Sequence, residues 1–442
     1  MTNYINPLHL TVANKSKQDW GRLYGSSIGL AISQIAQKQL LIVITPDSLT
    51  AQRLLEDIQF YARKDLPLFT FPDWETLPYD IFSPHQDIIS ARLTTLYNLP
   101  DIENGILILP ISTLMYRLAP TDYVRTNSLL FATEQLLNPA KLRQRLEANG
   151  YCWVETVEEH GQFLIRGGII DLFPMGCEVP YRIELFDNEI DTIRSFDPET
   201  QRSISTIKEL RLLPARELPF SSEAISQFQI QWHEHFTAKP ANCPLYQDIT
   251  TGMIPAGIEY YLPLFFNKTS TLFDYLPTAN TEIPNSSCQI ATLPGTLAAA
   301  EQFWQEINER YEQLRHDIER PILPPDKLFL QANEVFAGIN NYSHIKLSQE
   351  PTTKSTGSNF STQEPPNLSV DARTDKPLVK LQNFLEEFPG RTLLIAETVG
   401  RREILLETLG KYKLQPKLVD SWWEFIDSKN IFCMTVAPLE HG

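Results

Sequence analysis

The stretch from Arg22 to Gly29 lies where a phosphate-binding loop would lie in an α/β protein, just before a helical pattern. A working loop of the form G-x-x-x-x-G-K-[ST] needs a lysine for the β- and γ-phosphates and a hydroxyl group for Mg²⁺. In the closest register, Ile28 stands at the lysine position and Gly29 at the hydroxyl position. We therefore expect this degenerate loop to bind no nucleotide cofactor. Its residues are Gly25, Ser26, Ser27, Ile28 and Gly29.

Other reactive side chains do not combine into a catalytic or metal site. His233-Glu234-His235 has no third ligand at a suitable spacing, and alternate residues of a helix point to different sides, so a solvated surface is favoured. Asp87, near His85, has no partner that would make an acid/base pair. Five scattered cysteines are typical of reduced thiols, not of disulfides or zinc ligands. We predict no catalytic residue and no metal.

A binding surface is the better candidate, and it lies in the stretch Tyr181–Phe186. Strand geometry places Tyr181, Ile183 and Leu185 on one face, and Arg182, Glu184 and Phe186 on the other. The first set is the expected core side, which leaves an aromatic ring beside an arginine on the exposed side; both residue types dominate interface energetics. We expect the neighbouring strand to add Arg166, just before Gly167-Gly168, where a partner backbone could approach closely. The alternative is that another domain covers Phe186 and that both arginines are ordinary surface residues.

The first predicted unit, residues 1–127, is α/β. Residues 40–44 and 106–109 are short apolar runs that are typical of buried parallel strands. Helical patterns follow the first run, through Leu54 and Ile58, and precede the second, through Leu93 and Leu96. Strands that alternate with helices predict a doubly wound sheet.

The second predicted unit, residues 128–214, is α+β. It begins with a helix over Pro139–Asn149 that Gly150 ends. Strands are expected over 163–173, 181–186 and 189–196, and Asp187-Asn188 joins the last two as a two-residue hairpin turn. These features predict a small antiparallel sheet.

Three further segments complete the chain. Residues 215–348 contain a helix with Phe303, Ile307, Tyr311, Leu314 and Ile318 on one stripe. Residues 349–376 are rich in Ser, Thr, Gln, Glu, Pro and Asn, so we expect a flexible linker. Residues 377–442 carry helices over 378–388 and 401–409 and strands over 392–395 and 431–436, which predicts a small α/β unit. Because the chain stops just after the last strand, we expect this unit to be truncated.

Composition limits the classes of protein to consider. With 442 residues and 42% apolar residues, the chain is long enough for several globular units. A net charge of −16 argues against a general nucleic-acid-binding surface, which needs clustered Lys and Arg. The chain has no long apolar run and no signal-peptide core, so we expect a cytoplasmic protein with no membrane partner.

Several longer stretches closely resemble the bacterial transcription-repair coupling factor family, and the likeness covers nearly the whole chain except the expected linker. They are Asp73–Asp80, Phe82–Leu93, Glu159–Gly161, Arg166–Gly167, Asp171–Gly176, Phe196–Arg202 and Pro255–Tyr260.

The resemblance implies an N-terminal module similar to UvrB, a component of the bacterial excinuclease. It implies that residues 128–214 are inserted into an α/β domain that residues 215–348 complete, and that this domain has lost its nucleotide loop. The inserted domain would recruit the excinuclease component UvrA through the positions that match Arg166, Arg182 and Phe186. Complete family members add an RNA-polymerase-binding domain, an ATP-driven DNA translocase and a C-terminal domain that covers the recruiting surface. The motifs of these domains do not occur in this sequence, so RNA polymerase and DNA would be partners only of domains outside it.

We therefore expect an adaptor in transcription-coupled nucleotide excision repair, in the form of a piece of a longer protein or a shortened gene product. Two alternatives come from other classes. An ATP-dependent DNA helicase is disfavoured by Ile28, and a direct DNA-damage-binding protein is disfavoured by the net charge.

Overall fold

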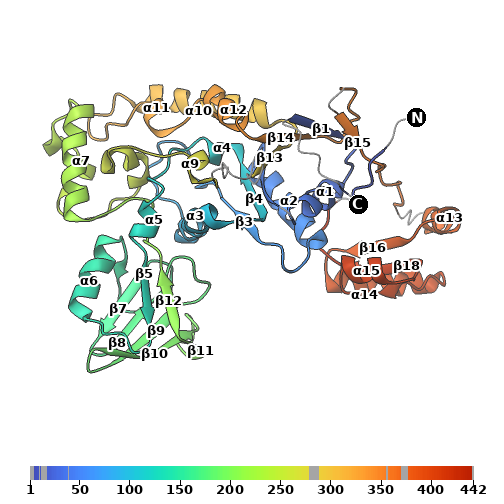
Figure 1. The fold of residues 1–442 in the computed structure, drawn as a ribbon, viewed down its shortest axis with the longest axis horizontal. Helices are drawn as coiled ribbons and strands as arrows, with labels where there is room; N and C mark the ends of the chain where they lie inside the picture. The colour runs from blue at the N-terminus through green and yellow to red at the C-terminus, as the bar shows by residue number, and fades with distance from the viewer. Residues whose placement is uncertain are drawn as a thin grey trace, which may run out of the picture.

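The computed structural model describes residues 4–8, 10, 17–37, 39–277, 288–354, 357–369 and 377–440. Figure 1 shows an elongated arrangement: a central α/β body, a sheet-containing unit that projects from one side of it, and a smaller α/β unit beyond one end. The predicted combination of α/β and α+β architectures is confirmed.

The central body is built on a seven-stranded sheet whose strands all pair in parallel. Its strand order is β15-β1-β14-β13-β2-β4-β3. The bounds are Lys17–Gly21 for β1, Leu40–Thr45 for β2, Leu68–Thr70 for β3, Gly105–Pro110 for β4, Gln289–Thr292 for β13, Ser343–Leu347 for β14 and Gly357–Asn359 for β15.

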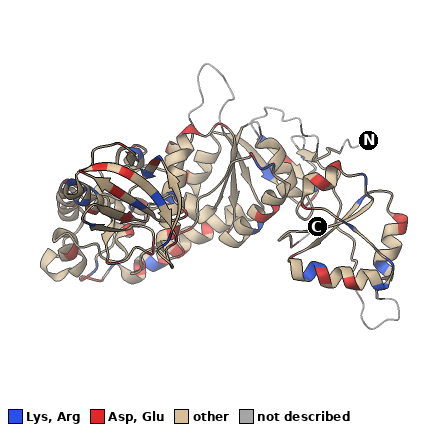
Figure 2. Ribbon diagram, turned by 90° about the horizontal axis from the view of Figure 1, so that it is seen from below, with Lys and Arg blue, Asp and Glu red and all other residues tan. Residues whose placement is uncertain are grey.

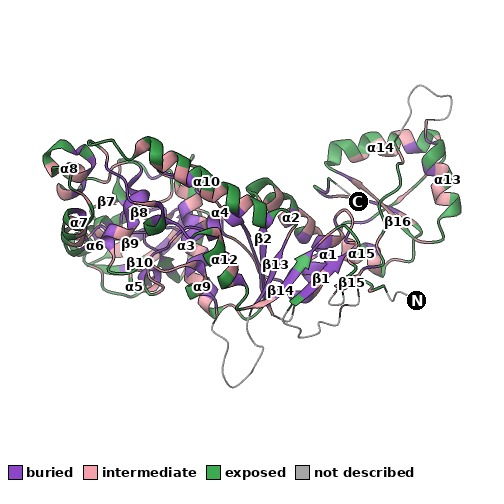
Figure 3. Ribbon diagram, turned by 90° about the horizontal axis from the view of Figure 1, so that it is seen from above, coloured by how far each residue is buried: buried purple, intermediate pink, exposed green. Residues whose placement is uncertain are grey.

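Helices cover both faces of this sheet, so its central strands are buried on both sides (Figure 3). Along β2, Ile42 and Ile44 pack into one apolar cluster, whereas Leu41 and Val43 pack into another on the opposite face. The first cluster includes side chains of α3 (Gln86–Asn98), α10 (Thr296–Leu314) and α12 (Ala332–Ile339). The second includes side chains of α1 (Ser27–Ile35) and α2 (Ser48–Tyr61).

The projecting unit contains a six-stranded sheet of order β11-β10-β9-β8-β7-β6, in which only β6 and β7 pair in parallel. The predicted helix is present as α6, Pro139–Ala148. Asp187 and Asn188 form the predicted turn, with φ of +47° and +67°. The strand bounds are Cys152–Trp153 for β6, Gln162–Arg166 for β7, Ile169–Leu172 for β8, Tyr181–Phe186 for β9, Glu189–Phe196 for β10 and Ser203–Ile207 for β11.

One predicted strand of this unit is wrong. The stretch 163–173 forms two strands, β7 and β8, because Gly167 adopts φ +60° and reverses the chain. A separate two-stranded sheet of β5 (Leu129–Ala132) and β12 (Glu209–Leu212) links the unit to the central body (Figure 1).

Short helices and turns fill the end of the central body beside this junction. The predicted long helix is α10, but Ile318 lies beyond its end and is exposed, because the Asp317 side chain accepts hydrogen bonds from the backbone of Glu319 and Arg320 in a turn. The remaining elements are α4 (Ile111–Leu114), α5 (Tyr123–Thr126), α7 (Ser222–His235), α8 (Pro244–Thr250), α9 (Leu272–Tyr275), α11 (Pro325–Leu328), η1 (Leu99–Asp101), η2 (Pro240–Asn242) and η3 (Ile258–Phe265).

The expected flexible linker over 349–376 is wrong in its first half. Residues Gly357–Asn359 form β15 and pair with β1 at the edge of the main sheet. Phe360 is fully buried and packs against Trp20, with 5.0 Å between the ring centroids. A polar segment can be ordered in this way because it adds a strand to a sheet that other residues have already built. Residues 355–356 and 370–376 of the expected linker lie outside the described residues.

The last unit is a three-stranded parallel sheet of order β16-β18-β17 with helices α13, α14 and α15. Helices α13 and α14 and strands β16 and β18 were predicted from the sequence, whereas the short outer strand β17 and α15 were missed. The bounds are Val379–Glu387 for α13, Thr392–Ala396 for β16, Val399–Lys411 for α14, Lys417–Leu418 for β17, Trp422–Asp427 for α15 and Phe432–Val436 for β18.

Charges of both signs are interspersed over the described ribbon. Lys and Arg alternate with Asp and Glu in the view of Figure 2, and they do not gather there into one basic stripe. Among the described helices, none is both long and apolar enough to cross a lipid bilayer.

Candidate functional site

The loop between β1 and α1 is closed by the protein's own backbone. The amides of Arg22 and Leu23 donate to the carbonyl oxygens of Glu350 and Ser348, at 3.2 and 3.1 Å. The amide of Tyr24 donates to the Thr362 hydroxyl at 3.3 Å. A phosphate-binding loop works by presenting unpaired amides to the anion. In this chain the segment around β15 takes them instead.

The positions of the missing lysine and hydroxyl are also filled structurally. Ile28 is buried in the apolar cluster that α1 shares with the sheet. A side-chain carbon at Gly29 would lie 2.8 Å from the Cβ atom of Asp57 on α2, so this position has no space for a hydroxyl-bearing residue. The geometry thus gives a second, independent argument against a nucleotide at this loop.

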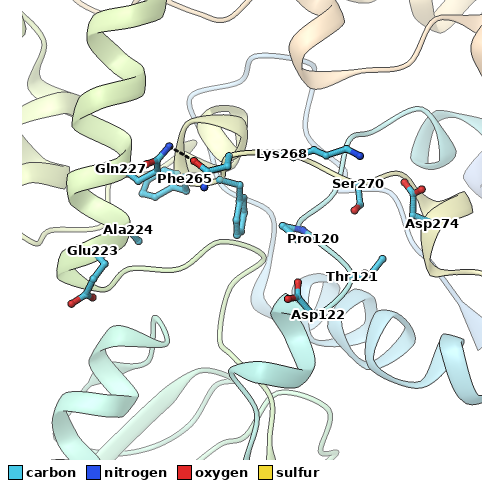
Figure 4. Close-up of a pocket in the computed structure, with 12 residues that line it drawn as sticks. Pro120, Thr121, Asp122, Glu223, Ala224, Gln227, Phe265, Lys268, Ser270 and Asp274 are labelled. Atoms are coloured by element: carbon cyan, nitrogen blue, oxygen red, sulfur yellow. Dashed lines mark hydrogen bonds between the residues drawn. The ribbon is translucent and has the colours of Figure 1, made fainter.

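The remaining candidates for chemistry stay apart. His233 and His235 are exposed at the end of α7, and the described residues contain no cluster of three potential metal ligands. A hollow of about 780 Å³ lies between α7, the segment around Asn267 and residues 120–122 (Figure 4). Among its lining residues, the Gln227 side chain donates a hydrogen bond to the Asn267 side chain. No histidine or cysteine is among its described lining residues. It offers no nucleophile with an adjacent base.

The predicted binding surface is present on the six-stranded sheet. On β9, Ile183 is fully buried and Tyr181 and Leu185 pack against the main core. Phe186 projects from the opposite face with 73% of its side chain exposed, and no other described unit covers it. The predicted separation of the two faces is therefore confirmed. We refer below to Arg166, Arg182 and Phe186, the residues predicted to recruit a partner, as the recruiting residues.

Arg182 is held in one orientation by its neighbours on the same face. Its Nε and Nη2 atoms donate to the two carboxylate oxygens of Asp171 on β8, at 2.6 and 2.9 Å. Its guanidinium lies 5.0 Å from the ring centroid of Phe196 on β10. The hydrogen bonds to Asp171 raise the pKa of Arg182, although partial burial acts in the opposite direction. The side chain is thus charged and ordered while remaining partly exposed.

Arg166 lies farther from the other recruiting residues than expected. It is on β7, and β8 separates β7 from β9, so Arg166 is not on the neighbouring strand. Its Nη2 atom donates to the carbonyl oxygen of Glu155 at 3.0 Å. Gly167 and Gly168 form the turn after it, and a side chain at Gly168 would meet the carbonyl oxygen of Leu185. The close approach at Gly168 is therefore to the chain's own β9, whereas Gly167 has open space around it.

Asp171, Asp191 and Arg194 shape this face and were not predicted from the sequence. Asp171 pairs with Arg182, and Arg194 on β10 forms an ion pair with Glu184 at 3.3 Å. A bulge at Asp191 places Arg194 opposite Arg182; without it, Ile193 would lie there. The hairpin turn was a usable signal for the register of β9 and β10, but the bulge shifts that register by one residue.

Two of the stretches that carried the family resemblance, Phe82–Leu93 and Glu159–Gly161, supply contacts between distant parts of the chain. Arg92 pairs with Glu217 at 2.5 Å, with both side chains almost fully buried, and its guanidinium lies 4.1 Å from the Phe71 ring centroid. His160 on the projecting unit contacts Asp87 on α3 at 2.6 Å. These contacts hold the projecting unit against the central body, so their role in this structure is architectural.

Comparison with known proteins identifies the family. A family model described as the UvrB interaction domain matches residues 129–218, and one described as the MFD D3 domain matches residues 384–442. A transcription-repair-coupling factor from Haemophilus influenzae is 41% identical over 430 residues, which is 96% of this chain. The chain belongs to the transcription-repair-coupling factor family. The Escherichia coli and Bacillus subtilis family members are 39% identical over 427 residues and 28% identical over 289 residues.

The matched region is a minor part of these relatives. This chain spans 36% of the length of the Haemophilus influenzae and Escherichia coli family members and 24% of the Bacillus subtilis one. The first matching model begins at β5 and ends just after β12, and therefore covers the projecting unit with all three recruiting residues.

Proposed function

We propose that this chain is an adaptor for transcription-coupled nucleotide excision repair that binds the excinuclease component UvrA through the outer face of its six-stranded sheet. The observation that carries the proposal is an exposed Phe186 on the same face of β9 as an ordered Arg182, on a unit that matches the UvrB interaction domain model. Phe186 supplies apolar area, and Arg166 and Arg182 supply directional charge, as expected of interface hot spots.

The proposal divides the chain into parts with different tasks. Residues 128–214 bind the partner, and residues 1–127 and 215–348 form the body that carries them. Residues 377–442 have no assigned task. RNA polymerase and DNA would be contacted by domains outside this sequence. The translocase that the family resemblance implies would bind ATP.

An ATP-dependent DNA helicase acting through the β1–α1 loop is the second candidate, and no observation favours it. The amides of Arg22, Leu23 and Tyr24 are bonded to residues 348–362, and Ile28 is buried at the lysine position. A direct DNA-binding role has no support from the interspersed charges of Figure 2.

The test is calorimetry of the 442-residue chain with purified UvrA, in the absence of ATP and RNA polymerase. We expect binding, and we expect Phe186→Ala or Arg182→Ala to weaken it by about 2 kcal/mol or more, as for hot-spot residues. Arg166→Ala should weaken it as well, whereas a matched exposed aliphatic residue on α7, Ile230→Ala, should not.

Melting curves of the same variants separate binding from folding. Phe186 is exposed, so Phe186→Ala should leave the melting temperature nearly unchanged. Equal affinities for the unmodified chain and all three variants would refute the proposed site. Weaker binding together with a large loss of stability would show that the residues are structural.

A further inference from the structure

We infer that Asp171 is a positioning residue, which holds Arg182 so that this arginine binds the partner through the far edge of its guanidinium. This inference rests on the proposed function and deepens it. It concerns a residue that contacts the arginine and not the partner, and it specifies how the arginine can be used.

The pair is formed across two adjacent strands in direct register. Asp171 on β8 lies opposite Arg182 on β9. The two parallel hydrogen bonds, Nε to Oδ1 and Nη2 to Oδ2, match the planar fork of a guanidinium to the planar carboxylate. A long side chain with several rotatable bonds is thereby restricted to one arrangement.

The surroundings of the pair decide which part of the Arg182 guanidinium a partner can reach. Asp171 is 7% exposed, and Phe196 beneath the guanidinium is fully buried in a cluster with Leu164 and Phe173. Arg182 keeps 24% of its side chain exposed. The acid and the ring are therefore inside the unit, and the part of the arginine that remains accessible is the part they do not contact.

The accessible part has a defined chemistry. A guanidinium has five N–H groups, and Asp171 takes the one on Nε and one on Nη2. The far edge keeps one N–H on each Nη atom pointing the same way. This edge suits a carboxylate or a pair of carbonyl oxygens that approaches end-on. A lysine, with a single ammonium group, cannot bind Asp171 in this way and also present such an edge.

A double-mutant cycle tests the inference. UvrA binding is measured by calorimetry for the unmodified 442-residue chain, Asp171→Asn, Arg182→Ala and the double variant. Releasing one ordered side chain costs about 0.5–1.5 kcal/mol on binding, so Asp171→Asn should weaken affinity about two- to tenfold. In the Arg182→Ala background the same change should have no further effect. Additive effects of the two changes would overturn the inference, because a general structural role does not depend on Arg182.

Two further variants keep the test informative. Asp171→Glu retains the charge and displaces the carboxylate by one methylene, so it should weaken binding even if Asp171→Asn folds poorly. Arg182→Lys should weaken binding nearly as much as Arg182→Ala. Asp101→Asn is the matched control, since Asp101 pairs with Arg125 at 2.6 Å on the central body, away from this sheet. Full affinity in both Asp171→Glu and Arg182→Lys would overturn the inference.

A measurement without the partner separates this inference from the proposed function. In arginine-selective NMR spectra, the Nε–H group of Arg182 should exchange slowly with water in the unmodified chain and rapidly in Asp171→Asn. Equal exchange rates would refute the positioning role whatever the behaviour of UvrA. Slow exchange without any binding of UvrA would instead refute the proposed function and leave the clamped arginine established.

Discussion

At the level of single residues, the ion pairs of this chain differ greatly in how much they contribute to the stability of the folded state. Arg92 and Glu217 are withdrawn from water almost completely, and the pair joins α3 to the segment that leaves the projecting unit. Arg315 and Glu312, in contrast, lie at the exposed end of α10, and both side chains are well solvated. Burial decides the difference, because an uncompensated charge is costly only where water cannot reach it.

Arg92→Ala should therefore lower the free energy of unfolding by about 3–5 kcal/mol, since it leaves the Glu217 carboxylate buried without a counter-charge, with the Trp74 indole N–H donating to it at 3.4 Å. Urea unfolding followed by circular dichroism measures this. Arg315→Ala is the matched control and should cost less than about 1 kcal/mol. If Arg92→Met combined with Glu217→Leu is no more stable than Arg92→Ala, the unpaired carboxylate is not the cause of the loss.

Among the elements, β15 forms the outermost strand at one edge of the main sheet. It pairs with β1, and the residues on either side of it bond to the loop between β1 and α1. The segment that contains this strand therefore takes three amides of that loop, those of Arg22, Leu23 and Tyr24, and is itself ordered although it is polar. The first consequence can be tested by changing Ile28 and Gly29 in the loop, and the second by changing Phe360 after β15.

Restoring the consensus residues of the loop should not restore nucleotide binding. The double variant Ile28→Lys, Gly29→Ser puts a charge into an apolar cluster and a side chain against Asp57, so it should melt at a lower temperature than the unmodified chain. Neither protein should be stabilised by ATP-Mg²⁺ or hydrolyse ATP. A ligand at 100 times its dissociation constant adds about 2.7 kcal/mol of stability. A Mg²⁺-dependent rise in melting temperature in either protein would show that the loop is open to nucleotide.

Limited proteolysis should distinguish the ordered from the exposed part of the expected linker. We expect early cleavage within residues 363–369, which are mostly exposed and form no helix or strand, and protection of β15. Phe360→Ala removes a fully buried ring, so it should lower the free energy of unfolding by at most about 3–5 kcal/mol. It should also extend cleavage into residues 349–362. Phe388→Ala, at a half-exposed ring on the last unit, is the control. Early cleavage of the unmodified chain within β15 would show that its pairing with β1 is not stable.

In the molecule as a whole, the projecting unit shares one apolar cluster with the central body, and specific polar and aromatic contacts also join the three bodies. The projecting unit is attached to α3 through His160–Asp87 and through the Gly176 amide, which donates to Ser90. The last unit is attached to α2, where Trp422 packs edge-on against Tyr61 at 5.0 Å. The contacts of the projecting unit hold it beside α3, on one side of the central body (Figure 1).

The contact between the last unit and α2 should depend on pH. Burial, and then the nearby Glu56 and Glu440, raises the pKa of Asp57 to about 7. An unfolded chain releases this proton near pH 4, so between about pH 4 and pH 7 the folded state binds more protons, and its stability falls as the pH rises. Above pH 7 the full cost of the buried charge is present. Arg53 on α2, which pairs with Glu440 at 2.8 Å, partly offsets the acidity of this contact.

Asp57→Asn removes the titrating group, so the variant should melt at a higher temperature than the unmodified chain at about pH 8, and the difference should shrink towards about pH 4. Differential scanning calorimetry across this range gives the comparison. Asp65→Asn, at an exposed position just beyond α2, should show no such pH-dependent difference. A constant difference between Asp57→Asn and the unmodified chain at every pH would mean that titration of Asp57 is not its cause.

The local features of this protein could be predicted from its sequence. Apolar runs predicted β2 and β4, helical periodicity predicted α6 and α10, and Asp187-Asn188 predicted its turn, because each depends only on residues close together in the chain. The exposed face of β9 followed from alternation alone. The absence of the lysine at Ile28 was equally a local fact. Strand patterns singled out Arg166, Arg182 and Phe186, and the family resemblance matched the same three positions.

How these features combine depends on tertiary contacts that the sequence did not reveal. The pairing of β15 with β1 joins Asp19 to Gly357, and no local pattern encodes a contact across so many residues. Likewise, Asp171 meets Arg182 through strand register, Arg166 lies two strands away, and the bulge at Asp191 decides which β10 side chain reaches the shared face. Register and strand order follow from packing of the whole sheet, since a shift of one residue would turn every apolar side chain towards water.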